Sequence, residues 1–170
     1  SATIMDILVM FPYVIPGAVL GISLLITYNK GPILIAGTPL ILIIAYIIRK
    51  MPYTVRSSSA ILQQIDSSVE EASISLGETP MKSFFKVTVR IMMPGIVSGA
   101  ILSWISTINE LSSSIMLYTG KTATISVAIY TEVVRASFGT AAALASILTV
   151  ATLLSFVLFN IISKGKVSVV

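Results

Sequence analysis

The residue types that carry out most enzyme chemistry are missing from this sequence. It contains no histidine and no cysteine, which excludes imidazole acid–base catalysis, thiolate nucleophiles and the usual zinc ligands. Its apolar segments hold no pair of aspartates, and no Gly-x-x-x-x-Gly-Lys-Ser/Thr phosphate loop occurs. These absences argue against an intramembrane protease or lipid-modifying enzyme. They also predict a chain without a metal site, a cofactor or ATP hydrolysis of its own.

One carboxylate, Glu110, falls within an apolar segment, beside Asn109 and among serines and threonines. An ionisable group inside a membrane is costly, and it usually indicates a transport path or a paired charge. If the segment instead ends near Ile108, Glu110 lies at the outer membrane interface. The two interpretations stay open, and the first predicts that Asn109 and Glu110 line or gate a translocation path.

A second polar stretch, VEEASISLGETPMKSFF (residues 69–85), is a charged island in an otherwise apolar chain. Before it, residues 55–68 carry apolar positions at rough helical spacing, which predicts an amphipathic helix. Gly77 and the pair Thr79 and Pro80 interrupt the island, which predicts helix, turn and helix. Glu70 and Glu78 are interpreted as solvent-facing charges. A short helix of this composition is suited to insertion into a groove of a partner protein.

The composition indicates that a lipid bilayer surrounds most of the chain. Of the 170 residues, 55% are hydrophobic and only 11% are charged, and the mean hydropathy is +0.98. The net charge of +4 does not indicate nucleic-acid binding, because Lys and Arg lie between apolar runs instead of clustering with aromatic residues. We therefore expect membrane lipid, and no nucleic acid, among the partners.

Four apolar blocks approach the length of about 20 residues that a helix needs to cross a bilayer. The spans are predicted at about residues 4–28, 33–48, 91–117 and 138–162, with a loop at about residues 49–90. Pro12 and Pro16 predict kinks in the first span. The predicted fold is an all-α polytopic transmembrane helix bundle, formed by residues 1–170 as a single domain.

Two Gly-x-x-x-Gly spacings predict close helix contacts, because glycine lets two helix backbones approach in lipid. They are Gly17 with Gly21 and Gly95 with Gly99. Since the sequence lacks an initiator Met and a basic leader region, we also expect it to begin inside a longer protein, after at least one further span.

The basic residues predict the orientation of the spans. Eight of the 11 lie in the loop at 49–90 or after the last span: Arg49, Lys50, Arg56, Lys82, Lys86, Arg90, Lys164 and Lys166. Basic residues near membrane spans favour the cytoplasmic side. The central loop and the C-terminus are therefore predicted to be cytoplasmic.

The island contains Glu71, Ala72 and Ser73, then three residues, Gly77, nine residues, Val87, one residue and Val89. This order resembles the signature loop of ATP-binding-cassette (ABC) importer permeases, in which Glu-Ala-Ala and Gly precede two aliphatic residues and a proline. Ser73 replaces the third small residue, and Arg90 stands where the proline is expected. The resemblance implies a type I permease fold whose cytoplasmic coupling helices contact an ATPase through the matching residues: Glu71, Ala72, Ser73, Gly77, Val87 and Val89.

Two further segments, FPYVIPGAVLGISLL and NELSSSIMLYTGKTATISVAIYTEV, are similar to permeases of the ferric iron group. This implies the C-terminal half of an iron(III) permease in a bacterial inner membrane. The partners implied are ABC ATPase subunits, which use ATP and Mg²⁺, an external substrate-binding protein and a second permease half. A permease of the same class for polyamine, sulfate, molybdate or another small solute is the alternative. An ATP-independent channel or secondary transporter would leave the loop as a passive connector.

Overall fold

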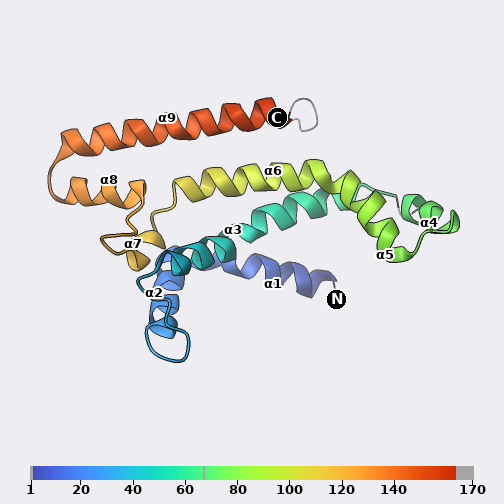
Figure 1. Ribbon diagram of the computed structural model, residues 1–170, viewed down its shortest axis with the longest axis horizontal. Coiled ribbons are helices and arrows are strands. Elements are labelled where there is room, and N and C mark those ends of the chain that lie inside the picture. The colour runs from blue at the N-terminus through green and yellow to red at the C-terminus, as the bar shows by residue number, and fades with distance from the viewer. Residues whose placement is uncertain (1, 67, 164–170) are drawn as a thin grey trace.

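The computed structural model describes residues 2–66 and 68–163, and every element of regular structure in those residues is helical (Figure 1). The all-α prediction is therefore confirmed. The helices are α1 (Ala2–Val14), α2 (Gly17–Tyr28), α3 (Pro39–Leu62), α4 (Ser68–Ser75), α5 (Pro80–Ser83), a π-helical turn (Phe84–Thr88), α6 (Val89–Ile108), α7 (Ser114–Leu117), α8 (Ile125–Val134) and α9 (Phe138–Ser163).

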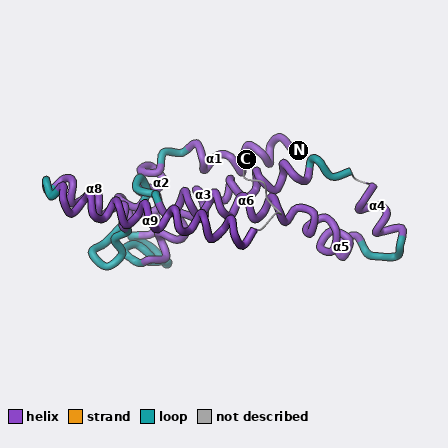
Figure 2. The backbone as a smooth tube through the Cα atoms, turned by 90° about the horizontal axis from the view of Figure 1, so that it is seen from above, coloured by secondary structure: helices purple, strands orange, loops and turns teal. Residues whose placement is uncertain are grey.

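Helices α1, α3, α6 and α9 run along the long axis of the molecule, and neighbours in this order pack against each other (Figures 1 and 2). Helices α4 and α5 lie at one end of the long axis, whereas α2, α7 and α8 lie at the other. Successive long helices run in opposite directions. The start of α1, the end of α3 and the start of α6 therefore lie toward the end that carries α4 and α5, as expected for a chain that crosses a membrane repeatedly.

The first predicted span, residues 4–28, consists of two helices instead of one kinked helix. Helices α1 and α2 meet at 96°, with Ile15 and Pro16 between them. Proline has no backbone N–H, and it disfavours helical backbone in the residue before it. Pro16 (φ −55°, ψ 133°) therefore ends one helix and begins the next at a new angle.

The helix in the region of the second predicted span, 33–48, begins and ends later than that span. Helix α3 begins at Pro39, where proline suits the first helical position, and it continues to Leu62. The predicted loop at 49–90 therefore begins later, and much of the predicted amphipathic helix at 55–68 is the second half of α3. Arg49 and Lys50 are not loop residues, because both lie in the middle of this 24-residue helix.

The third span, predicted at 91–117, is also displaced. Helix α6 ends at Ile108, and α5, the π-helical turn and α6 together form an apolar segment from Pro80 to Ile108. The fourth predicted span, 138–162, corresponds to α9 within one residue. Lys164 and Lys166, which entered the orientation prediction, lie outside the described residues.

Within the described residues, Pro80–Ile108 and Phe138–Ile161 have the length and composition of membrane spans, and the bent pair α1 and α2 could supply a third. Helix α3 does not qualify on composition, because it carries Arg49, Lys50 and Arg56. Lys50 is nevertheless buried inside the protein, with 8% of its surface exposed. Its charge therefore does not face lipid.

The predicted glycine contacts are confirmed. Gly95 and Gly99 of α6 are buried against the backbone of α3, where a Cβ added at Gly95 would lie 2.7 Å from the Ser57 carbonyl oxygen. Gly17 and Gly21 are also buried, against side chains of α3 and the segment around α7. The glycines thus set the closest approaches between the helices.

Replacing Gly99 with leucine is expected to lower the free energy of unfolding by about 1–3 kcal/mol, the usual cost of overpacking. A side chain there would collide with the Thr54 backbone, which cannot move without bending α3. Thermal unfolding in detergent measures the effect. The control is Gly139→Ala in α9, where nothing lies within 4 Å of an added Cβ. Equal melting temperatures for the two variants would contradict the close contact.

Candidate functional site

The segment between α3 and α6 forms a compact projection at one end of the molecule (Figure 1). Glu71 and Ala72 are exposed on α4, and Ser73 is half-buried. Gly77 follows α4 with φ +95°, a conformation that other residues rarely adopt. Nothing lies within 4 Å of a Cβ at Gly77, so the backbone angle and not lack of space requires glycine.

Side-chain hydrogen bonds hold α4 against α5 and the π-helical turn that precedes α6. The Thr88 hydroxyl donates to Glu70 Oε2 at 2.9 Å, and the Ser83 hydroxyl donates to the Glu70 carbonyl oxygen at 3.3 Å. Ser83 and Thr88 are both buried. The interpretation of Glu70 as a solvent-facing charge is therefore wrong, because its carboxylate fastens α4 to the π-helical turn.

Two exposed carboxylates also have partners in this projection. Lys86 Nζ donates to Glu78 Oε1, and this bond holds the pKa of Glu78 below its usual value. The Ser68 backbone N–H donates to Asp66 Oδ1 at 2.9 Å, which lowers the pKa of Asp66 and satisfies an otherwise free N–H at the start of α4. These contacts give the projection a defined shape without a partner.

The outer surface of the projection carries large apolar side chains. Leu76 is 88% exposed, Met81 68% and Phe85 63%. Glu71 lies in the first turn of α4, and its carboxylate makes no hydrogen bond or ion pair among the described residues. Val87 and Val89 are instead half-buried where the projection meets α6. The signature positions thus divide into a free surface around Glu71 and an anchoring region at Val87 and Val89.

A second candidate site lies at the far end of α6. Glu110 and Lys50 are buried, and Lys50 Nζ donates to Glu110 Oε2 at 2.7 Å and to the Ser106 hydroxyl at 2.9 Å. Arg49 Nε lies 3.6 Å from the same carboxylate oxygen. The three residues Arg49, Lys50 and Glu110 are called the charge cluster below. Its net charge is positive, since one carboxylate faces two cations.

The structure agrees with one part of each interpretation of Glu110. The helix does end near Ile108, as the interface alternative required, yet Glu110 is buried and paired instead of lying at an exposed interface. Asn109 is exposed, and its amide donates to the Ile105 carbonyl oxygen at 3.0 Å. Asn109 and Glu110 are neighbours in the sequence, but the first side chain is exposed and the second is buried.

Sequence reasoning missed Arg49 and Lys50, which it interpreted as loop charges that set the orientation. The pairing of Lys50 with Glu110 joins residues far apart in the sequence, and no local spacing signals it. The signal in the sequence was a positive charge, Lys50, and a negative charge, Glu110, each next to or within an apolar segment. Because an unpaired charge is costly in a membrane, each charge indicated that a partner existed.

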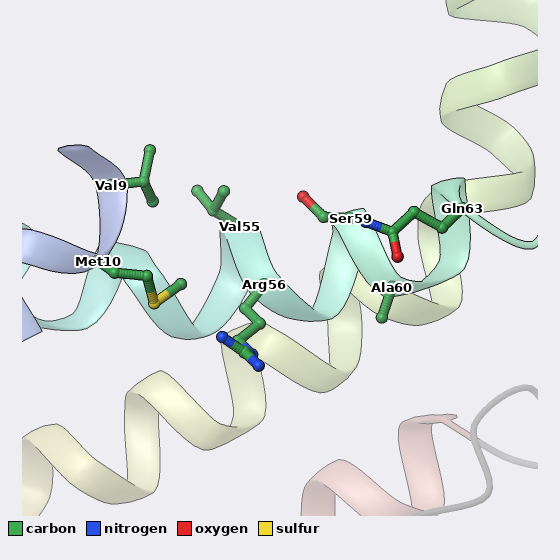
Figure 3. Close-up of a pocket in the computed structure, with 7 residues that line it drawn as sticks. All are labelled: Val9, Met10, Val55, Arg56, Ser59, Ala60 and Gln63. Carbon is green, nitrogen blue, oxygen red and sulfur yellow. The ribbon is translucent and has the colours of Figure 1, made fainter. Parts of the chain in front are cut away.

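A cavity of about 260 Å³ opens between α1 and α3, and its lining side chains are drawn in Figure 3. They are Val9, Met10, Val55, Arg56, Ser59, Ala60 and Gln63. The lining offers one cation and no carboxylate. Among the described residues, no three His, Cys, Asp or Glu side chains gather closely enough to hold a metal ion.

Comparison with known proteins identifies the family. The family described as "Binding-protein-dependent transport system inner membrane component" matches residues 2–167. The ferric transport system permease protein FbpB of Actinobacillus pleuropneumoniae is 30% identical over 155 residues, which are 91% of this chain and 22% of that protein. The putative 2-aminoethylphosphonate transport system permease protein PhnV of Salmonella typhi is 30% identical over 153 residues, 90% of this chain and 58% of that protein.

The sulfate transport system permease protein CysT of Escherichia coli K12 is 28% identical over 172 aligned residues, with 94% of this chain and 61% of that protein covered. The chain thus spans between 22% and 61% of the length of these three relatives. The family match, in contrast, covers nearly the whole chain, and the helical fold and apolar spans agree with it. The chain belongs to the family of binding-protein-dependent transport system inner membrane components.

Proposed function

We propose that this chain is the membrane-spanning permease of an ABC importer and that residues 68–88, called the docking segment below, bind an ATPase subunit. The observation that carries this proposal is the exposure of Leu76, Met81 and Phe85 on the same docking segment that exposes the Glu71 carboxylate. An apolar surface with a charge at its edge is typical of a protein interface.

The proposal includes an orientation and further partners. The docking segment faces the cytoplasm, where ATP is present, and the ATPase supplies the ATP and Mg²⁺ chemistry that this chain lacks. A substrate-binding protein delivers the solute on the other side, and a second permease half completes the path. Asn109, which is exposed near the far end of α6, remains the candidate for lining that path, and Glu110 acts through its buried ion pairs.

Iron(III) is the proposed substrate, supported by the name of the ferric permease relative. Relatives of comparable similarity are named for sulfate, for molybdate or tungstate and for 2-aminoethylphosphonate. Uptake of each labelled solute by proteoliposomes containing the full-length protein, its ATPase and its binding protein distinguishes them. ATP-independent uptake would instead support a channel or secondary transporter.

Glu71→Lys and Gly77→Pro are each expected to weaken ATPase binding and uptake roughly ten-fold or more. The first reverses a charge at the interface, and the second cannot adopt the φ of +95°. Membrane level, ATPase co-purification and uptake are read on the same samples of the full-length protein. The control is Lys121→Glu, an exposed charge near α7 at the other end of the molecule. Retained ATPase binding in both docking variants would overturn the proposal.

A further inference from the structure

The charge cluster lies where two parts of the molecule meet. One part is the antiparallel pair α3 and α6, called the hairpin below, which carries the docking segment at one end. The other part consists of α2 and α7, which pack together beyond the opposite end of α6. Movement of the docking segment can reach α2 and α7 through this junction and through the apolar core that Leu24, Ile41, Leu42, Ala45 and Leu117 form between α2, α3 and α7.

The hairpin has the packing of a single rigid body. Gly95 and Gly99 bring the α6 backbone into contact with the α3 backbone at Ser57, Ser58 and Thr54. Closely packed interiors transmit displacement with little compression. A displacement of the docking segment therefore reaches Lys50 and Ser106 at the far half of the hairpin.

Glu110 connects the hairpin to the segment before α7 by dividing its two oxygens. Oε2 accepts from Lys50 on α3, whereas Oε1 accepts from the Ser113 backbone N–H at 3.2 Å and the Ser113 hydroxyl at 3.3 Å. A second link runs parallel to it, because the Tyr46 hydroxyl of α3 lies 2.6 Å from the Ser114 hydroxyl of α7. Ser113 and Ser114 are fully buried, so water does not compete for these bonds.

Arg49 connects the hairpin to the bend between α1 and α2. Its Nη1 donates at 3.1 Å to the Ile15 carbonyl oxygen, which lies at the interruption before Pro16. Gly17 makes room for this contact, since a Cβ there would lie 2.6 Å from Arg49 Nη1. One buried cluster therefore contacts the α1–α2 bend, the middle of α3, the end of α6 and the start of α7.

We propose that the charge cluster is the mechanical joint through which movement of the docking segment reaches α2 and α7. This inference rests on the proposed function, since it takes ATPase binding as the source of the movement. Buried charge-assisted hydrogen bonds are short and directional, so they hold the two parts in one relative geometry. The apolar core between α2, α3 and α7 also joins the two parts, but its contacts are not directional.

A purely structural role for the cluster makes a different prediction. Buried ionic triads can often be replaced by apolar residues of similar volume without loss of stability. The triple variant Arg49→Met/Lys50→Met/Glu110→Met removes every charge of the cluster and leaves none unpaired. If the cluster is a joint, this variant loses the coupling between the docking segment and α7. If the cluster only stabilises the fold, the methionine side chains replace it and coupling is kept.

The full-length protein with its ATPase and binding protein is reconstituted in proteoliposomes for the test. The triple variant is expected to keep its ATPase co-purification and to lose only some thermal stability, because the buried Ser113 backbone N–H and hydroxyl lose their acceptor. Stimulation of ATP hydrolysis by the loaded binding protein is expected to fall roughly ten-fold, within the usual range for coupling between distant sites. Uptake falls with it. Because Leu76 and Glu71 are untouched, lost ATPase binding is not part of the expected result.

Two further variants keep the test decisive if the triple variant does not fold. Tyr46→Phe/Ser113→Ala weakens the links to the α7 segment without changing any charge, and a smaller loss of stimulation is expected. Thr54→Val removes the 3.3 Å contact between the Thr54 and Ser103 hydroxyls within the hairpin, leaves the Ser103 hydroxyl bonded to the Lys50 carbonyl oxygen and is expected to behave as wild type. Normal stimulation in the first of these variants, or an equal loss in the second, overturns the joint.

The outcomes separate the two proposals. Normal uptake in the triple variant overturns the joint and leaves the docking proposal intact. Uptake that falls only in proportion to a lower melting temperature also overturns the joint, because the cluster then acts through stability. A wild-type protein that does not co-purify with the ATPase overturns the docking proposal and, with it, the source of movement that the joint requires.

Discussion

Lys50→Met is expected to lower the free energy of unfolding by about 3–5 kcal/mol, the usual cost of removing one partner of a buried ion pair. The substitution leaves the buried Glu110 carboxylate with Arg49, whose Nε lies 3.6 Å away without hydrogen-bond geometry. The charge then remains desolvated and poorly paired.

The single tryptophan allows the unfolding of Lys50→Met to be followed by fluorescence. Trp104 of α6 packs edge-on against Phe159 of α9, with 6.3 Å between the ring centroids, so its fluorescence reports loss of the α6–α9 contact. Lys86→Met is the matched control, because the Glu78–Lys86 pair is solvent-exposed and exposed ion pairs contribute little to stability. Similar unfolding curves for Lys50→Met and Lys86→Met would contradict the stabilising role of the buried pair.

Leu76→Asp is expected to abolish detectable ATPase binding, a loss of about 100-fold or more in affinity. Burying a leucine side chain is worth about 1.5–3 kcal/mol, and an aspartate in its place would put a charge into an apolar contact. Leu76 is 88% exposed at the end of α4, so the substitution leaves the fold of the chain unchanged. Co-purification with the ATPase, followed by a binding titration, measures the effect.

Leu34→Asp is the matched control for this prediction. Leu34 is 67% exposed and lies in the connection between α2 and α3, at the end opposite the docking segment. It is expected to leave ATPase binding unchanged. Unchanged binding in Leu76→Asp would place the ATPase contact elsewhere, and loss in both variants would indicate a general effect of an added charge.

The parts of the fold that sequence predicted well are those set by local composition. Helix α9 is a continuous apolar run without proline, and its bounds followed from that run. The glycine contacts followed from spacing along a single helix face. Glycine at position 77 was also expected to permit a turn, and φ of +95° agrees with that expectation.

The parts that sequence predicted poorly depend on contacts between distant residues. Helix α3 was cut short at Ile48 because Arg49 and Lys50 looked like the start of a polar loop, whereas Glu110 neutralises Lys50 inside the bundle. Glu70 looked solvent-facing because Thr88, its partner, follows a turn whose path no spacing revealed. Single-sequence patterns report the polarity of a residue but not the polar group that satisfies it.

The exposure of Leu76, Met81 and Phe85 has a consequence for the life of the protein in the cell. Under the docking proposal, a copy that has not bound an ATPase presents these apolar side chains on a projection that chaperones and proteases can reach, and exposed apolar patches promote aggregation. Assembly would cover the patch. Orphan copies are therefore expected to be cleared faster than assembled ones, which would keep the amounts of permease and ATPase in balance.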